Sequence, residues 1–127
     1  MLVGVALSDV TTEWSGNLAL WPGTHVLYEA YFREHGCEIL RKGGKEGMPP
    51  IDEPEAEQQM AKAGDVFFVH YQIKHGSATN VGPYPRYAIY FRLNHVDHDR
   101  QRFEALTDIW MEWEGIDPRK CQVTSDR

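Results

Sequence analysis

The sequence predicts a mainly β domain, a sandwich or small barrel of short strands with two covering helices. This prediction is based on five or six short segments that are apolar or alternate between apolar and polar residues, on glycine- and proline-rich turns between them, and on two helical patterns. A chain of 127 residues has the size of one domain and can bury a substantial core. We therefore expect residues 1–127 to form a single domain.

The first third of the chain predicts two strands and a helix. Residues 2–7 are a short apolar run, and residues 18–21 are a second one closed by a Pro-Gly turn. Thr24 can then cap a helix that runs to about His35, with Gly36 at its C-terminal end. The chain begins directly in an apolar strand, which suggests a beginning in mid-fold.

Residues 41–54 are dense in glycine and proline and predict a long, mobile surface loop. Loops of this length in a compact domain often close over a site as lids. A passive linker is the alternative interpretation.

The second half returns to strand patterns. Residues 57–62 suit an edge strand or a short helix, and the continuous apolar run 66–71 is typical of a fully buried strand. Residues 75–79 form a short extended segment. Residues 86–93 alternate and place three apolar side chains on one face, namely Tyr87, Ile89 and Phe91.

A C-terminal helix is predicted to end near Gly115 and to pack against the strands. Its apolar stripe consists of Phe103, Leu106, Trp110 and Trp113.

The composition excludes several classes of function. Apolar residues make up 42% of the chain, charged residues 25%, and the formal net charge is −6. An acidic chain without clustered Lys and Arg is not expected to bind nucleic acid. No apolar run approaches the roughly 18 residues of a membrane helix, and no signal peptide is recognisable, so no membrane partner is expected. Cys37 and Cys121 form neither a metal-binding pair nor a disulfide framework, so the expected location is the cytoplasm.

Six histidines raise the possibility of a metal site. A non-haem Fe(II) triad needs two His and one carboxylate, and His-x-Asp on a strand places two of these ligands on one face. The one such pair here, His95 and Asp97, follows the strands. Asp97 or Asp99 is better interpreted as a cap of the C-terminal helix.

A second constellation lies between the last two predicted strands. His75 and Ser77 share one face of an extended segment, and Arg86 opens the next strand after a turn. If these strands are neighbours, the three side chains converge inside one sheet. Arg could then clamp a carboxylate with two hydrogen bonds, and the Ser hydroxyl could add a third. A surface network of His and Arg is the alternative.

Three segments, in order, resemble the phytanoyl-CoA dioxygenase family. Residues 16–25 (GNLALWPGTH) resemble the family's "nG-l-x-x-x-PGSH" segment, and residues 64–68 (GDVFF) resemble its "GDv" strand. His75-Gly76-Ser77, then Asn80, then Arg86-Tyr87 resembles its "H-x-S…N…R" stretch. The ordered match covers roughly residues 2–93.

The resemblance implies a double-stranded β-helix (jelly-roll, cupin-like) fold, with Fe(II) as metal and 2-oxoglutarate as co-substrate. It implies that His75 is the distal histidine ligand of iron. Arg86 would pair with the distal carboxylate of 2-oxoglutarate, and Ser77 would donate a hydrogen bond to the same carboxylate.

The other histidines receive structural interpretations. His25 falls in a loop motif of the family and not at a ligand position. His70 is interpreted as a core histidine, with a cavity-facing position as the alternative. His35 suits the C-terminus of the first helix, where the helix dipole favours a cation.

The sequence also departs from the family. The family's His-x-Asp pair lies upstream of the strand that resembles residues 2–7, and no His-x-Asp or His-x-Glu occurs between Met1 and His75. The chain is therefore expected to be the C-terminal part of a jelly-roll oxygenase, incomplete at its N-terminus, as a gene fragment or a degenerate domain. We expect it to be inactive alone, with no catalytic residue of its own. Fe(II) and 2-oxoglutarate belong to the complete family fold, and this chain need bind neither.

Three functions remain open. The first is part of an Fe(II)/2-oxoglutarate-dependent dioxygenase that hydroxylates a small organic substrate. The second is a non-catalytic jelly-roll module that binds a small carboxylate through Arg86 and Ser77, and the third is a cupin-type isomerase or hydrolase without redox chemistry. In each case an uncovered apolar strand at residues 2–7 predicts a homodimer through open sheet edges or faces.

Overall fold

The computed structural model describes residues 1–120, which divide into two compact units. The first unit comprises Met1–Leu27 and Pro50–Asn94, and the second comprises Tyr28–Pro49 and the residues from His95 onward. All strands of the described chain lie in the first unit. Within residues 1–120, no helix has the length and apolar character needed to cross a membrane. A single domain over residues 1–127 stays a prediction.

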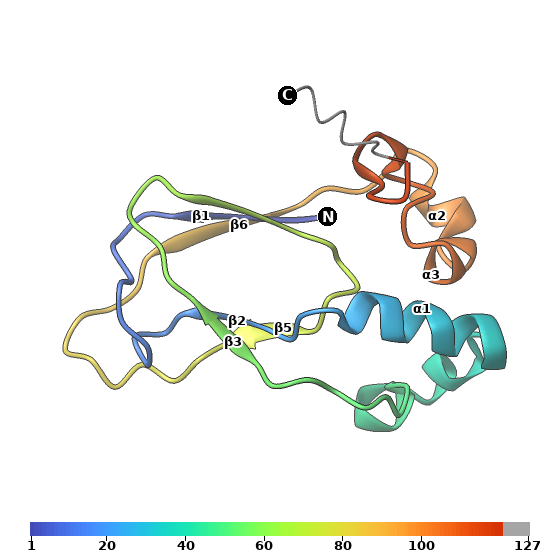
Figure 1. The fold of residues 1–127 in the computed structure, drawn as a ribbon, viewed down its shortest axis with the longest axis horizontal. Helices are drawn as coiled ribbons and strands as arrows, with labels where there is room; N and C mark the ends of the chain where they lie inside the picture. Colours follow the sequence, from blue (N-terminus) through green and yellow to red (C-terminus); the bar gives the residue numbers. More distant parts are fainter. Residues whose placement is uncertain (121–127) are drawn as a thin grey trace, which may run out of the picture. The chain divides into compact units, whose positions relative to one another are not determined.

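One sheet of the first unit has three antiparallel strands in the order β4-β1-β6 (Figure 1). These strands are β1 (Leu2–Ala6), β4 (Val66–Val69) and β6 (Ala88–Arg92). In β1, Gly4 lies opposite Phe67 of β4 and Tyr90 of β6. The apolar run at the start of the chain is thus the central strand of this sheet, so the expectation that residues 2–7 form an uncovered strand is wrong: β4 and β6 pair with its two edges.

The second sheet also has three antiparallel strands, in the order β3-β2-β5. They are β2 (Leu18–Leu20), β3 (Glu57–Gln59) and β5 (His75–Ser77). Leu18 of β2 lies opposite Ser77, and Leu20 lies opposite His75. The edge-strand interpretation of residues 57–62 is confirmed for their first half.

The two sheets lie as two layers with an apolar core between them (Figure 1). Leu2 and Val69 of the first sheet pack against Leu18 of the second, and three further apolar side chains surround this cluster, namely Leu20, Phe67 and Ile73. The predicted mainly β architecture is present as two small antiparallel sheets that do not close into a barrel. The finer assignment to a jelly roll stays a prediction.

The prediction of a fully buried strand at residues 66–71 is wrong for β4. Phe67 and Val69 face the core, whereas Val66 and Phe68 are exposed on the other face of the sheet. A continuous apolar run indicates burial on both faces only if a second layer covers each face, and here one face is covered.

Helix α1 (Thr24–His35) matches its predicted bounds, and Gly36 follows it with a φ of 72°, in the left-handed region that glycine favours. Thr24 does not act as the predicted cap. Its Oγ1 donates to the Trp21 carbonyl at 2.8 Å and accepts the Lys74 amide proton at 2.9 Å, which ties the start of α1 to the start of β5. His35 lies in the last turn as expected, stacked on the ring of Tyr31 at 4.5 Å.

The predicted loop at residues 41–54 contains short helical turns. The first 3-10 helix covers Glu38–Lys42 and the second covers Gly44–Gly47, and the chain is irregular from there to β3. Both helices lie in the second unit. The mobility of this segment stays a prediction.

The predicted C-terminal helix is wrong as one continuous element. The chain forms α2 (His98–Gln101), α3 (Glu104–Thr107) and a 3-10 turn at Glu114–Ile116. The buried residues of this segment include Ala105 and Ile109, which are not part of the predicted apolar stripe. Phe103, which is part of that stripe, is exposed. The backbone N–H of Ile109 donates to the Glu29 carboxylate at 3.2 Å, which ties the chain after α3 to α1.

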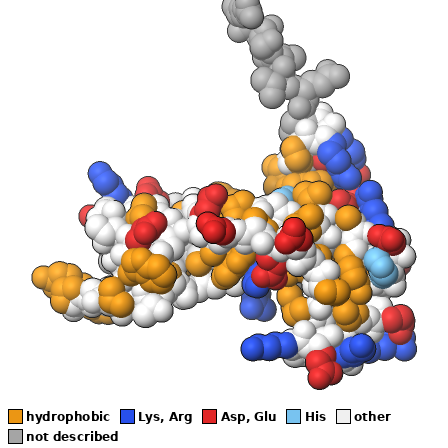
Figure 2. Space-filling model, turned by 60° about the horizontal axis from the view of Figure 1, so that its bottom comes forward, with side chains coloured by type: hydrophobic (Ala, Val, Ile, Leu, Met, Phe, Trp, Pro, Cys, Tyr) orange, Lys and Arg blue, Asp and Glu red, His pale blue; other side chains and the backbone are white. Residues whose placement is uncertain are grey.

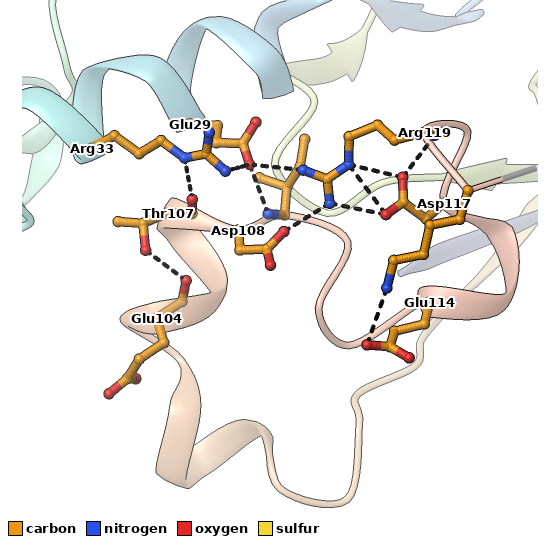
Figure 3. Close-up of polar contacts among 10 residues, drawn as sticks. Glu29, Arg33, Glu104, Thr107, Asp108, Glu114, Asp117 and Arg119 are labelled. Carbon is orange, nitrogen blue, oxygen red and sulfur yellow. Dashed lines mark hydrogen bonds and ion pairs between the residues drawn. The ribbon is translucent and has the colours of Figure 1, made fainter.

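A polar network holds this C-terminal segment to α1 within the second unit, where Arg33 Nε donates to the Thr107 carbonyl and Arg119 Nη1 lies 3.9 Å from Glu29 Oε1 (Figure 3). Arg119 Nε lies 2.9 Å from Asp117 Oδ1, and its Nη2 lies 2.8 Å from Asp108 Oδ1. Glu29 accepts a hydrogen bond from Arg33 Nη2 at 2.9 Å (Figure 3). The hydrogen bonds from Arg119 lower the pKa of Asp117, against the opposing effect of burial. The same bonds raise the pKa of Arg119.

Candidate functional site

The guanidinium of Arg86 is the centre of the candidate site. Its Nη2 donates to Ser77 Oγ at 3.2 Å, and its Nη1 donates to Tyr90 Oη at 2.7 Å. The guanidinium carbon also lies 5.7 Å from the centroid of the Tyr90 ring. The predicted convergence of Ser77 and Arg86 is therefore present in the structure.

The convergence arises between the two layers and not inside one sheet, as the sequence suggested. Ser77 lies in β5 of one sheet, whereas Arg86 precedes β6 of the other. Ser77 lies opposite Leu18, whose side chain packs in the core, so the Ser77 hydroxyl is on the inner face of its sheet. Tyr90 lies two residues from Arg92, the partner of core residue Leu2, and so shares the inner face of the other sheet. The Ser77–Arg86–Tyr90 contact thus joins the two sheets.

Two glycines lie next to this contact, Gly4 where there is no room for a side chain and Gly16 where the backbone φ favours glycine. At Gly4, a Cβ would lie 2.8 Å from Tyr90 Cε1, closer than such contacts allow. At Gly16, whose φ is 76°, a Cβ would lie 3.6 Å from the Cβ of Arg86. Gly16 also belongs to the segment that carries the family resemblance.

His75 lies on the same face as Ser77, two residues away in β5, and its side chain is exposed. Its Nδ1 is 2.7 Å from the Ile73 carbonyl oxygen. Since a carbonyl can only accept, Nδ1 donates this hydrogen bond, and in the neutral ring Nε2 then holds the lone pair. This is the tautomer in which a histidine ligates a metal through Nε2.

The described residues do not fit a complete iron site. Within residues 1–120, no group of three or more His, Cys, Asp or Glu side chains is placed to hold a metal ion. His75 alone offers one of the three ligands that a facial triad needs.

His95 and Asp97 form a local turn and not part of the site. His95 Nδ1 accepts the Asp97 amide proton at 3.1 Å, and the ring lies 3.9 Å from the carboxylate. Asp97 occupies the residue before α2, as expected for a cap, but its side chain makes no capping hydrogen bond. Its carbonyl accepts the Arg100 amide proton at 2.9 Å instead.

Arg86 borders two cavities of the first unit. A cavity of about 20 Å³ lies between the layers, and its lining includes Leu18, Phe67 and Tyr90. A larger cavity of about 250 Å³ lies beside the turn regions, and its lining includes Asp9 and Asn80. The first has room for about one water molecule, and the second is somewhat smaller than the cavities of about 300 Å³ and above that hold typical ligands. A ligand at Arg86 would therefore have to be small.

Sequence reasoning missed two residues of the site. Alternation along residues 86–93 puts Tyr90 on the same face as Arg86, and this pattern is the signal that could have identified Tyr90. Asn17 is fully buried, and its Nδ2 donates to the carbonyls of Thr12 and Gln59 at 3.1 and 3.2 Å. Asn17 thereby fixes the loop that carries Gly16 beneath Arg86.

Two further histidines lie close together in the first unit. His25 and His70 have ring centroids 5.6 Å apart. His70 is buried, as the core-histidine interpretation expects, and its Nδ1 accepts the Gln72 amide proton at 3.1 Å. Neither residue lies among those that line the cavities at Arg86.

Comparisons with protein-family models, curated proteins and solved structures found no match to this chain.

Proposed function

We propose that this chain binds a small dicarboxylate of the 2-oxoglutarate class through Arg86 and Ser77. In this proposal the chain is the carboxylate-holding part of a jelly-roll dioxygenase. The observation that carries the proposal is the contact of Arg86 with Ser77 and Tyr90 between the two layers.

The charge of Arg86 supports an anionic ligand. Its hydrogen-bond partners are two neutral hydroxyl groups, and among the described residues it forms no ion pair with a carboxylate. A half-buried guanidinium offers five N–H donors, of which these contacts use two. Carboxylate binding would use the remaining donors and compensate the charge.

The catalytic part of the proposal rests on the resemblance to phytanoyl-CoA dioxygenases. Bound iron and 2-oxoglutarate would supply the oxidising chemistry for hydroxylating a small organic substrate. The protonation of His75 at Nδ1 suits one iron ligand, but the described residues provide no further ligands beside it. We therefore propose that residues 1–127 alone bind a carboxylate without oxygenase activity, as a non-catalytic module would.

Titration with 2-oxoglutarate, followed by NMR of the ¹⁵N-labelled chain, tests the binding proposal. Two or three charge-assisted hydrogen bonds of about 1.5–3 kcal/mol each, less an association cost of about 4 kcal/mol, predict a Kd in the millimolar range. Arg86→Ala should abolish the shifts of the Ser77 amide, and Ser77→Ala should weaken binding several-fold. The control is Arg100→Ala, which removes an exposed arginine of the second unit. Equal binding by Arg86→Ala and the wild-type chain would disprove the assignment.

Release of CO2 from 2-oxoglutarate tests the catalytic part separately. The purified chain with Fe(II) should release none above background. Iron-dependent release would mean that this chain assembles a complete site, which contradicts the proposal of an inactive module.

The predicted homodimer and cytoplasmic location belong to the same proposal. The ladder order leaves β4 and β6 as the edges of one sheet, and β3 and β5 as the edges of the other. Open edges and open faces both support self-association.

A further inference from the structure

The sheet β4-β1-β6 has an outer face, directed away from the core, that carries no charged residue. The register places Val3 between Phe68 and Phe91, and Val5 between Val66 and Ile89. Core residue Leu2 points to the inner face, so its neighbour Val3 points outward, and the cross-strand partners point with it. We call these side chains the outer face: Val3, Val5, Val66, Phe68, Ile89 and Phe91.

Four side chains of the outer face are exposed. Phe68 is 71% exposed and Phe91 is 50% exposed, while Val66 and Ile89 are 48% and 45% exposed. Charged and apolar side chains are interspersed on the surface drawn in Figure 2, as is usual for a surface that faces water. A contiguous sheet face made of apolar residues alone is unusual on a monomer.

The area of this face is sufficient for a specific interface. A fully exposed aromatic side chain presents about 150–250 Å², so the four exposed residues present roughly 400 Å². Flanking apolar residues on the same strand faces extend the surface to roughly 700 Å² per chain, and they are Leu7, Tyr87 and Leu93. Two such faces together would bury roughly 1,400 Å², which is above the threshold of about 1,000 Å² for a specific interface.

We propose that the outer face packs against the outer face of a second copy of this chain. This inference rests on the proposed homodimer and selects the face, not a strand edge, as its interface. The chain carries a net charge of −6, and an interface without charged side chains brings two copies together without placing like charges in direct contact. A two-fold axis brings the same patch of both copies together, with the two sheets about 10 Å apart as in a β-sandwich.

Pairing through the β6 edge is less favourable. The Leu7 amide donates to the Tyr87 carbonyl, and the Leu93 amide donates to the Met1 carbonyl. By the alternation of an antiparallel ladder, Ala88 and Tyr90 direct their N–H groups away from β1, so this edge is free to pair. A symmetric pairing centred on Ile89 would, however, set Arg86 of one copy opposite Arg92 of the other, and like charges directly opposite are destabilising.

Sedimentation equilibrium of the purified chain over a range of concentrations tests this proposal. The wild-type chain should form a dimer, and the double variant Phe68→Thr/Phe91→Thr should weaken dimerisation at least tenfold. Threonine keeps the strand preference of these positions while it removes apolar area. The control is Val81→Thr, which changes a 75% exposed valine outside the outer face and should leave the dimer unchanged.

An edge-blocking variant separates the face from the edge. Ala88→Pro removes an N–H that points away from β1, so it should leave a face-to-face dimer intact. If Ala88→Pro abolishes the dimer while the threonine pair does not, the interface is the edge and our inference is wrong, although the homodimer stands. A wild-type chain that stays monomeric overturns both the proposed homodimer and the proposed interface.

Circular dichroism of each variant checks that the fold is kept. If the phenylalanine pair does not fold, Val66→Thr/Ile89→Thr removes less area from the same face and should also weaken the dimer. A folded Val66→Thr/Ile89→Thr chain with unchanged dimerisation would contradict the proposed face.

Discussion

The ring of Tyr90 lies directly over Gly4, its cross-strand partner, with no space for a side chain at residue 4. The same tyrosine accepts the hydrogen bond from Arg86 Nη1 at 2.7 Å. The Tyr90 ring thus packs on Gly4 on one side and holds the Arg86 guanidinium through its hydroxyl on the other. A side chain at residue 4 would push the ring away and would move the guanidinium with it. The candidate site depends on the packing of β1 as well as on its own polar residues.

Gly4→Ala should displace the Tyr90 ring and with it Arg86. We expect a loss of about 1–3 kcal/mol in the free energy of unfolding, as is usual for overpacking. The affinity for 2-oxoglutarate should also fall several-fold. Chemical denaturation and NMR titration measure the two effects. Gly115→Ala is the matched control, since no atom lies within 4 Å of its added Cβ, and normal affinity in Gly4→Ala would contradict the link.

Arg86→Lys should not preserve carboxylate binding. Lysine keeps the positive charge but lacks the planar set of donors that reaches Ser77, Tyr90 and a carboxylate together. We expect the Kd for 2-oxoglutarate to rise roughly tenfold, which corresponds to the loss of about one hydrogen bond to a charged group. If NMR titration shows equal affinity, charge alone accounts for binding and the geometric argument fails.

Asn17→Ala should destabilise the first unit. It would leave the carbonyls of Thr12 and Gln59 and the amide of Ser15, in part-buried contacts, without the partner that Asn17 provides. Unpaired buried polar groups predict a loss of about 2–4 kcal/mol in the free energy of unfolding. Urea denaturation gives this value. Asn80→Ala, which alters an exposed asparagine of the same unit, should cost less, and equal losses would refute the role of Asn17.

Acid should loosen the second unit through Asp117. The hydrogen bonds from Arg119 lower the pKa of Asp117 from its ordinary value of 3.8. The resulting stabilisation is fully present above pH 3.8, and it is lost as the pH falls through the lowered pKa of the folded state. Amide exchange of residues 104–120 should therefore accelerate in acid in the wild-type chain.

Asp117→Asn removes this titrating group, so exchange in the variant should be faster at neutral pH and change less in acid. Asp99→Asn, an exposed substitution in α2, serves as the control and should behave as the wild-type chain does. An unchanged acid response in Asp117→Asn would show that another carboxylate is responsible.

Local signals in the sequence determined several elements by themselves. Helix α1 has the predicted bounds because a Pro-Gly turn precedes it and Gly36, with its positive φ, follows it. Strand β1 follows from a short apolar run, although its central position between β4 and β6 was not predicted. The meeting of Ser77 and Arg86 followed from residue spacing and from an ordered resemblance, although the sheets that carry them were not distinguished.

Tertiary structure decided the features that depend on residues far apart in the chain. The Ile109 amide donates a hydrogen bond to Glu29, which is 80 residues away in the chain, and periodicity cannot reveal such a partner. The residues predicted to form one C-terminal helix form α2, α3 and a 3-10 turn instead. Phe68 is exposed although it is strongly hydrophobic. Hydrophobicity indicates which side chains prefer burial, but it does not indicate whether a second layer is present to bury them. Tyr90 became part of the site because Gly4, its cross-strand neighbour, has no side chain to keep the ring away.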